Sequence, residues 1–431
     1  MKPEMKIRDW AERFPELCRV EERIIFTIAP GTTASPVDVE TETKAALAHP
    51  IASVPLKDLA PRGGRVLLLS DDLTRPTPRS RLVPAILDEL NEAGVPDTRI
   101  DILIALGTHR AMTETEIRRA FGEDVVRRVR IFNHDFRDPQ QLVSCGHTPL
   151  GTPVLVNRRV VEAGLVLGIG SIVPHPEAGW SGGAKILQPG VCGEETTAWT
   201  HMLAARQADH LGLAGVEENP VRNEIEQVAI QGGLRFIVNV VLDGTGQVVQ
   251  VVAGDPIRAH RAGVAAARRI FVRPISKRAR LVIVDARPAD LDYWQGIKPL
   301  AFATRAVEEG GVVILVGDFP DGISPIYHAE FAAFGRKSCA QLRTEERRGE
   351  LKAGVCTEAL YLHAAILRIA KVMCVCRGMT VEERGTLGFH SAGSLGEALD
   401  WAQEELGGSA TVGVILQGGD VLPCIQMEGG S

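Results

Sequence analysis

The sequence predicts an α/β fold built from two domains, and three observations lead to this prediction. Short apolar runs rich in β-branched residues alternate with helical patterns, as expected for α/β domains. The chain has 431 residues, too many for one ordinary core at roughly 100–200 residues per domain. Apolar residues make up 45% and charged residues 24% of the chain, which indicates a globular protein and not a disordered one.

The N-terminal part begins with strands that are followed by helices. The apolar run over 65–70 predicts a strand, and apolar residues recur at helical spacing over 80–94. A second strand is expected over 99–106. Thr113, with Glu116 three residues later, forms a capping box and therefore predicts the start of the next helix.

The segment 164–190 begins as a strand and then becomes rich in Gly and Pro, which favours an ordered functional loop. Helices are expected after it over 194–206 and near 220–231. The next apolar runs predict a hairpin that turns at Asp243-Gly244, and a long helix follows over 256–270.

The strand pattern restarts at residue 280, after a basic segment that we interpret as a linker. We therefore expect an N-terminal catalytic and cofactor-binding domain over 1–272 and a C-terminal α/β domain over 280–431. The active site is expected in the cleft between them. In the second domain, strands are expected over 280–288, 310–318, 370–376 and 410–417, with helices such as 394–406 between them.

Charge and cysteine usage exclude several classes of protein. The net charge is −6 and the Lys and Arg residues are scattered, so nucleic acid is not an expected partner. The charged N-terminus does not resemble a signal peptide, and no apolar run reaches the roughly 18 residues of a membrane span. We expect a cytoplasmic protein without a membrane partner. A disulfide framework is not expected, and Cys374 and Cys376 are interpreted as small core residues.

Polar loops that follow strands are the places to search for a site, because ligands bind beyond the carboxyl ends of parallel strands. The loop 71–78 contains Asp72 and Arg75, and an arginine can grip a carboxylate or a phosphate. Its alternative role is an ordinary helix entry with a capping Asp and a surface Arg. The loop 107–110 places His109 beside a strand end, where it serves either as a ligand-contacting or as a structural histidine.

A third loop contains His175 and Lys185, and His201 lies on the helix beyond it. A lysine in an apolar, Gly-rich segment is partly desolvated, which makes its amine nucleophilic or suitable as a covalent tether. The alternative is a loop lysine in solvent. The histidines match no standard zinc signature, so acid–base chemistry and metal binding both remain open. In the loop 293–298, Lys298 is either an anion clamp across the cleft or an ordinary loop residue.

Five of these segments together resemble lactate racemase and its relatives, the family that uses a nickel-pincer nucleotide. The order and spacing of the five motifs over residues 65–300 carry the resemblance, whereas beyond residue 300 only the α/β pattern is shared. The motifs are DDLTRPTP (71–78), GTHR (107–110), HPEAGWSGGAKILQPG (175–190), TTAWTH (196–201) and WQGIK (294–298).

The resemblance implies a role for each matching residue. Lys185 would hold the cofactor, a pyridinium-3-thioamide-5-thiocarboxylate mononucleotide, through a covalent thioamide, and His201 would bind its nickel. His109 and His175 would act as acid and base on opposite faces of the substrate. Arg75, Gln295, Lys298 and Trp294 would bind the substrate, with Asp72, Ser181, Gly182 and Gly183 near the cofactor.

The implied activity is racemisation or epimerisation of a small 2-hydroxyacid, with lactate as the default substrate and the cofactor-making enzymes as transient partners. Removal of the α-hydrogen as hydride, followed by its return to the other face of a planar keto acid, requires a base on each face. The alternative substrates are malate and longer-chain, aromatic or sugar acids. A nicotinamide-dependent 2-hydroxyacid dehydrogenase is disfavoured because no strand leads into G-x-G-x-x-G. A non-catalytic carboxylate-binding or nickel-carrying protein would leave the paired His109 and His175 unexplained.

Overall fold

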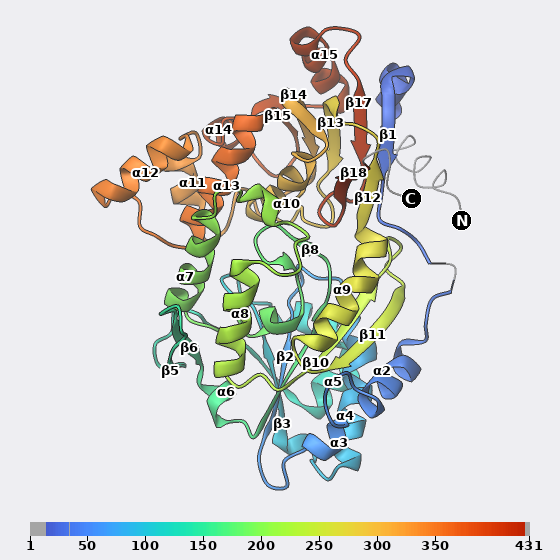
Figure 1. The fold of residues 1–431 in the computed structure, drawn as a ribbon, viewed down its shortest axis with the longest axis vertical. Coiled ribbons are helices and arrows are strands. Elements are labelled where there is room, and N and C mark those ends of the chain that lie inside the picture. Colours follow the sequence, from blue (N-terminus) through green and yellow to red (C-terminus); the bar gives the residue numbers. More distant parts are fainter. Residues whose placement is uncertain (1–13, 34, 427–431) are drawn as a thin grey trace.

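A computed structural model describes residues 14–33 and 35–426 and contains two six-stranded sheets (Figure 1). The first sheet has the order β11-β10-β7-β2-β3-β4, and the second has the order β1-β17-β13-β14-β15-β16. Neighbouring strands are parallel except for β10 and β11, which form the predicted hairpin around Asp243. The predicted α/β class is confirmed.

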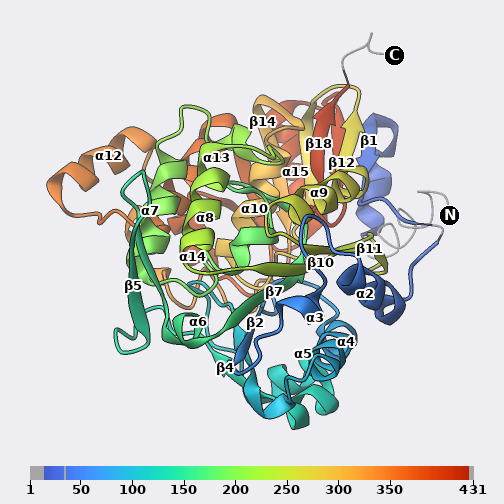
Figure 2. The same cartoon turned by 60° about the horizontal axis from the view of Figure 1, so that its bottom comes forward.

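Helices cover both faces of the first sheet, and this explains why its central strands β2, β7 and β10 are buried and mostly apolar. Leu68 packs toward α2, α4 and α5, whereas its neighbours Leu67 and Leu69 face the core beneath α8 (Figure 2). The strands are β2 (Val66–Ser70), β3 (Ile100–Ile104), β4 (Arg130–Asn133), β7 (Leu165–Ser171), β10 (Phe236–Leu242) and β11 (Val248–Gly254). The helices are α2 (Val39–Ala48), α4 (Arg79–Glu92), α5 (Glu114–Arg128), α8 (Pro220–Gln231) and α9 (Arg258–Phe271). The Thr113 capping box opens α5 as predicted.

The second sheet is also covered on both faces, by α10 and α13 on one side and by α15 on the other. Its strands are β1 (Ile24–Ile28), β13 (Ala279–Asp285), β14 (Val307–Val316), β15 (Ala370–Val375), β16 (His390–Ala392) and β17 (Val412–Ile415). Its helices are α10 (Tyr293–Ala303), α11 (His328–Phe334), α12 (Cys339–Arg348), α13 (Val355–Ile369), α14 (Val381–Thr386) and α15 (Leu395–Leu406). Cys374 is buried in β15, and Cys376 lies just beyond the strand, half-buried.

The strand pairing differs from the expected division of the chain at residue 272. The N-terminal strand β1 pairs with β17 of the second sheet (Figure 1), and Leu17 and Val20 of η1 (Pro15–Arg23) pack in that sheet's core. A short apolar strand fits either sheet, so only tertiary packing decides its partner. The predicted outer limits, residues 1 and 431, lie outside the described residues.

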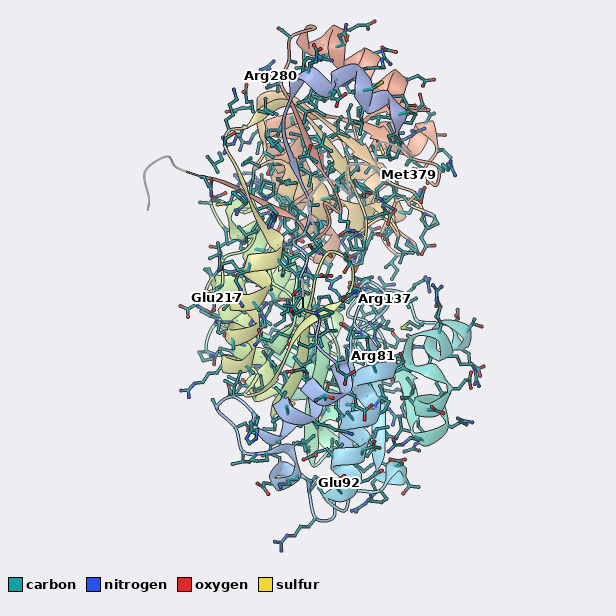
Figure 3. All side chains as sticks on the ribbon, turned by 90° about the vertical axis from the view of Figure 1, so that its right-hand side faces the viewer. Arg81, Glu92, Arg137, Glu217, Arg280 and Met379 are labelled. Atoms are coloured by element: carbon teal, nitrogen blue, oxygen red, sulfur yellow. The ribbon has the colours of Figure 1, made fainter. Side chains whose placement is uncertain are left out.

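Smaller elements lie around both sheet units, which Figure 3 shows from the side with Arg81 and Glu92 on one unit and Arg280 on the other. The strand β12 (Val272–Ile275) pairs with β18 (Leu422–Ile425) and ties the end of the chain to the linker. The remaining elements are α3 (Leu56–Leu59), η2 (Asp97–Arg99), β5 (Leu142–His147), β6 (Pro153–Asn157), α6 (Arg158–Glu162), β8 (Pro174–His175), β9 (Gly179–Trp180), η3 (Gly183–Ile186), α7 (Glu194–Ala205) and η4 (Leu211–Leu213).

We predict that acid lowers the stability of the fold, because His363 is buried in the core of the second unit. Its Nε2–H donates to the carbonyl of Leu387 (3.0 Å), its Nδ1 accepts from the hydroxyl of Tyr293 (2.5 Å), and burial lowers its pKa to about 4. Between pH 6.5 and pH 4 the unfolded chain binds a proton that the folded chain excludes. The free energy of unfolding therefore falls as pH falls, by up to about 1.4 kcal/mol per pH unit for this group.

The variant His363→Gln should remove this part of the pH dependence, as measured by urea unfolding at pH 7 and pH 5. The exposed His147→Gln is the matched control and should keep the parent slope. An unchanged slope in His363→Gln would contradict the assignment. Four other histidines whose pKa burial lowers add to the slope in the same direction, and these are His134, His175, His201 and His260.

Candidate active site

A cavity of about 160 Å³ lies where the two sheet units meet. Loops after β2, β3 and β7 form one wall, and the helices α10 and α13 form the other. All the side chains predicted for the site except Gly183 line this cavity, and these are Asp72, Arg75, His109, His175, Ser181, Gly182, Lys185, His201, Trp294, Gln295 and Lys298. The residues thus come together in one place, while their individual roles stay predictions.

His109 is held by one residue from each unit. Its Nδ1 lies 2.6 Å from Oδ2 of Asp72, and its Nε2 accepts a hydrogen bond of 3.0 Å from the side-chain amide of Gln295. Burial alone would raise the pKa of Asp72, but the charge and hydrogen bond of His109 outweigh burial and keep that pKa well below its usual range. The ionised carboxylate therefore orients the imidazole, with Nδ1 as the donor to Asp72.

His175 has a corresponding carboxylate partner, since its Nδ1 lies 2.8 Å from Oε2 of Glu177. Burial, together with the charge of Lys185, lowers the pKa of His175 to about 3, so the imidazole is neutral at neutral pH, and the backbone N–H of Ala178 also lies 3.4 Å from Nδ1. No role for Glu177 was expected from the sequence, although a carboxylate two residues after a candidate histidine was a usable signal. The cavity thus holds two imidazoles, each oriented by a carboxylate.

Lys185 lies in the short helix η3, which follows Gly182 and begins at Gly183, and both glycines are in the left-handed region. Burial lowers the pKa of Lys185 to about 7, so a large fraction of the amine is neutral and nucleophilic at neutral pH. Gly183 has φ +60°, and a Cβ there would lie 2.8 Å from the ring of His260. Gly183 therefore permits the turn that presents Lys185, instead of lining the cavity as expected.

His201 projects from α7 with a single free ring nitrogen. Its Nδ1–H donates to the backbone carbonyl of Thr197 at 2.8 Å, one turn earlier in the same helix. This bond fixes the tautomer and leaves Nε2 with its lone pair, which is the state in which histidine binds a metal. Burial lowers the pKa of His201 and so favours the same neutral form.

The two candidate carboxylate clamps differ in their charge balance. The guanidinium of Arg75 donates to the carbonyl and hydroxyl of Thr74 and forms no ion pair with a carboxylate in the described part of the chain. Lys298 already donates to Asp420 (3.1 Å), and burial lowers its pKa to about 8. Arg75 is thus the cation that is free for an anionic ligand. The segment 293–298 forms the first turns of α10 and not a loop, because Asp292 caps this helix.

A second buried pair borders the cavity and was not predicted from the sequence. Glu358, in the first turn of α13, lies 2.8 Å from Nε2 of His210, and burial, then the charge of Glu177, raises the pKa of Glu358 to about 7. Ligand atoms of Glu177, His210 and Glu358 all lie within 4.8 Å of one another. No spacing signal could reveal this cluster, because its members come from three separate segments.

Comparisons with known proteins identify the family of this chain. A sequence profile described as the lactate racemase N-terminal domain matches residues 16–212. A lactate racemase of Thermoanaerobacterium thermosaccharolyticum is 31% identical over 310 residues, which are 70% of this chain and 71% of that protein. The chain belongs to the lactate racemase family. A second family member, the lactate racemase of Lactiplantibacillus plantarum, is 31% identical over 66% of this chain and 67% of its own length.

Solved structures extend the likeness over nearly the whole chain. The lactate racemase apoprotein of T. thermosaccharolyticum superposes with a TM-score of 0.83 at 29% identity, covering 94% of this chain and 96% of its own. A Thermotoga maritima protein with a TM-score of 0.73 and 20% identity covers 91% of this chain and all of its own, and supports the fold alone. Within residues 14–33 and 35–426, no helix combines the length and apolarity needed to cross a bilayer.

Proposed function

We propose that this member of the lactate racemase family racemises or epimerises a small 2-hydroxyacid, with lactate as the default substrate. The observation that carries the proposal is the pair of carboxylate-oriented imidazoles, His109 and His175, in one cavity with a partly neutral lysine. The two sheet units would then be two domains that share an active site, and the small acid would bind between them.

The residues present fit a nickel-pincer nucleotide. Lys185 offers a neutral amine for a covalent thioamide, and His201 offers Nε2 as a nickel ligand. The buried hydroxyl of Ser171 lines the cavity and has no hydrogen-bond partner among the described residues, so it is available to a polar group of a nucleotide. When bound, this cofactor supplies an acceptor for the hydride on the substrate α-carbon.

The chain's own residues would orient the substrate and move its hydroxyl proton. Arg75 would bind the carboxylate, helped by Gln295 and Lys298. The substrate hydroxyl would replace the amide of Gln295 at Nε2 of His109, or bind Nε2 of His175, depending on the enantiomer. Asp72 and Glu177 would stabilise the imidazolium that forms on their respective sides.

Co-expression with the cofactor-making enzymes, which we propose as transient partners, tests this function. Intact mass should show a covalent addition on the parent protein, metal analysis should show nickel, and a single enantiomer of lactate should lose its optical rotation. The variant Lys185→Ala should show neither the added mass nor turnover. An unmodified Lys185 without nickel under these conditions would refute the proposal.

A further inference from the structure

The carboxyl group of Glu358 belongs to the cavity wall but has no part in the proposed proton transfers. Its side chain is 4% exposed, and its Oε1 lies 2.8 Å from Nε2 of His210. The geometry of this contact is not that of a hydrogen bond, and Oε1 has no other partner among the described residues. A buried, incompletely satisfied carboxyl beside a ligand cavity is costly unless a ligand contacts it.

Glu358 lies close to the candidate reacting groups. Its carboxylate is within 4.8 Å of that of Glu177, which in turn holds His175. The next wall residues on α13 are Ala359 and Leu362, so Glu358 is the polar group of that helix at the cavity. Glu358 therefore shares the cavity with His109 and His175 and offers a polar group there to a substituent of the bound acid.

We propose that Glu358, supported by His210, binds a hydroxyl group on C3 of the substrate. This inference rests on the proposed racemase function and narrows its substrate class to 2-hydroxyacids with a C3 hydroxyl, such as glycerate and longer polyhydroxy acids. Lactate, whose C3 is a methyl group, would then be a poorer substrate.

The chemistry of Glu358 and His210 favours a neutral polar substituent on C3 of the substrate. A methyl group would leave Oε1 of Glu358 buried without a hydrogen-bond donor, and a site built to bind a hydroxyl group discriminates strongly against a substrate that lacks it. A second carboxylate beside Glu358, as in malate, would lie near Glu177, whose pKa the contact with His175 keeps below its usual range despite burial, and like charges repel in a buried site. A hydroxyl group can donate a hydrogen bond to Oε1 of Glu358 without adding a charge to the cluster of Glu177, His210 and Glu358.

The test compares glycerate, lactate and malate as single enantiomers with the nickel-loaded protein, using chiral chromatography to follow each reaction. The value of kcat/KM for glycerate should exceed that for lactate by about 100-fold, with malate slower still. Equal or faster turnover of lactate or malate would overturn this inference and leave the proposed function intact. No turnover of any of the acids by protein that carries the modified lysine and nickel would overturn both.

Variants separate substrate binding from an indirect effect on His175. Glu358→Leu should reverse the preference toward lactate, Glu358→Gln should retain part of the preference for glycerate, and the exposed control Glu350→Leu should leave both rates unchanged. Equal loss of kcat for all three acids in both Glu358 variants would mean that Glu358 acts through Glu177 on His175, and the inference would be wrong. Circular dichroism of each variant identifies any loss that comes from misfolding.

Discussion

Replacing His175 by alanine is expected to lower kcat for racemisation by about 100- to 10,000-fold, the usual contribution of a general acid or base. Nδ1 of the imidazole contacts Glu177 and the backbone N–H of Ala178, Nε2 has no hydrogen-bond partner among the described residues, and burial lowers the pKa to about 3 so that the ring is neutral at working pH. Alanine removes this base and leaves Glu177 buried without its partner. The rate should be measured by chiral chromatography with the substrate found for the parent protein.

His109→Ala should show a loss of similar size, since Asp72 orients His109 in the same way. Both variants should still carry the mass added at Lys185 and should still hold nickel, because neither histidine is a proposed cofactor ligand. The exposed His147→Ala serves as the control and should keep the parent rate. Parent-level turnover in either His109→Ala or His175→Ala would refute the assignment of one base to each face.

Replacing Arg222 by methionine should reduce the free energy of unfolding by about 3–5 kcal/mol. This arginine of α8 is fully buried and donates to three backbone carbonyls of the Gly-rich loop, those of Ala178, Trp180 and Gly182. Methionine has a similar length but no donor, so the three carbonyls would lose their charged partner. The loop that presents Lys185 would then lose its anchor as well.

Chemical denaturation of the parent and of Arg222→Met measures this effect, with circular dichroism as the probe. The exposed Arg235→Met is the matched control and should change the free energy of unfolding by less than about 0.5 kcal/mol. Cofactor loading, read as the mass added at Lys185, should fall in Arg222→Met but not in the control. Parent stability in Arg222→Met would show that the loop is held by its other contacts.

Local signals in the sequence, together with the family resemblance, indicated most of the residues that line the cavity. Gly and Pro after a strand, together with His175 and Lys185, indicated an ordered functional loop, and the loops after β2 and β3 indicated Asp72 and His109. These signals are reliable because parallel strands present their carboxyl ends at one edge of a sheet. The partners Glu358, His210 and Asp420 were missed, since nothing in their spacing links them to the cavity.

The sequence by itself determined the α/β class, most strand and helix positions and the residues gathered at the cavity, because periodicity and turn residues act over short distances. Only the tertiary structure decided that β1 joins the second sheet, that α10 replaces an expected loop and that Asp420 balances Lys298. These features depend on contacts between residues far apart in the chain. Packing and charge pairing select such contacts in the folded protein, and no local pattern encodes them.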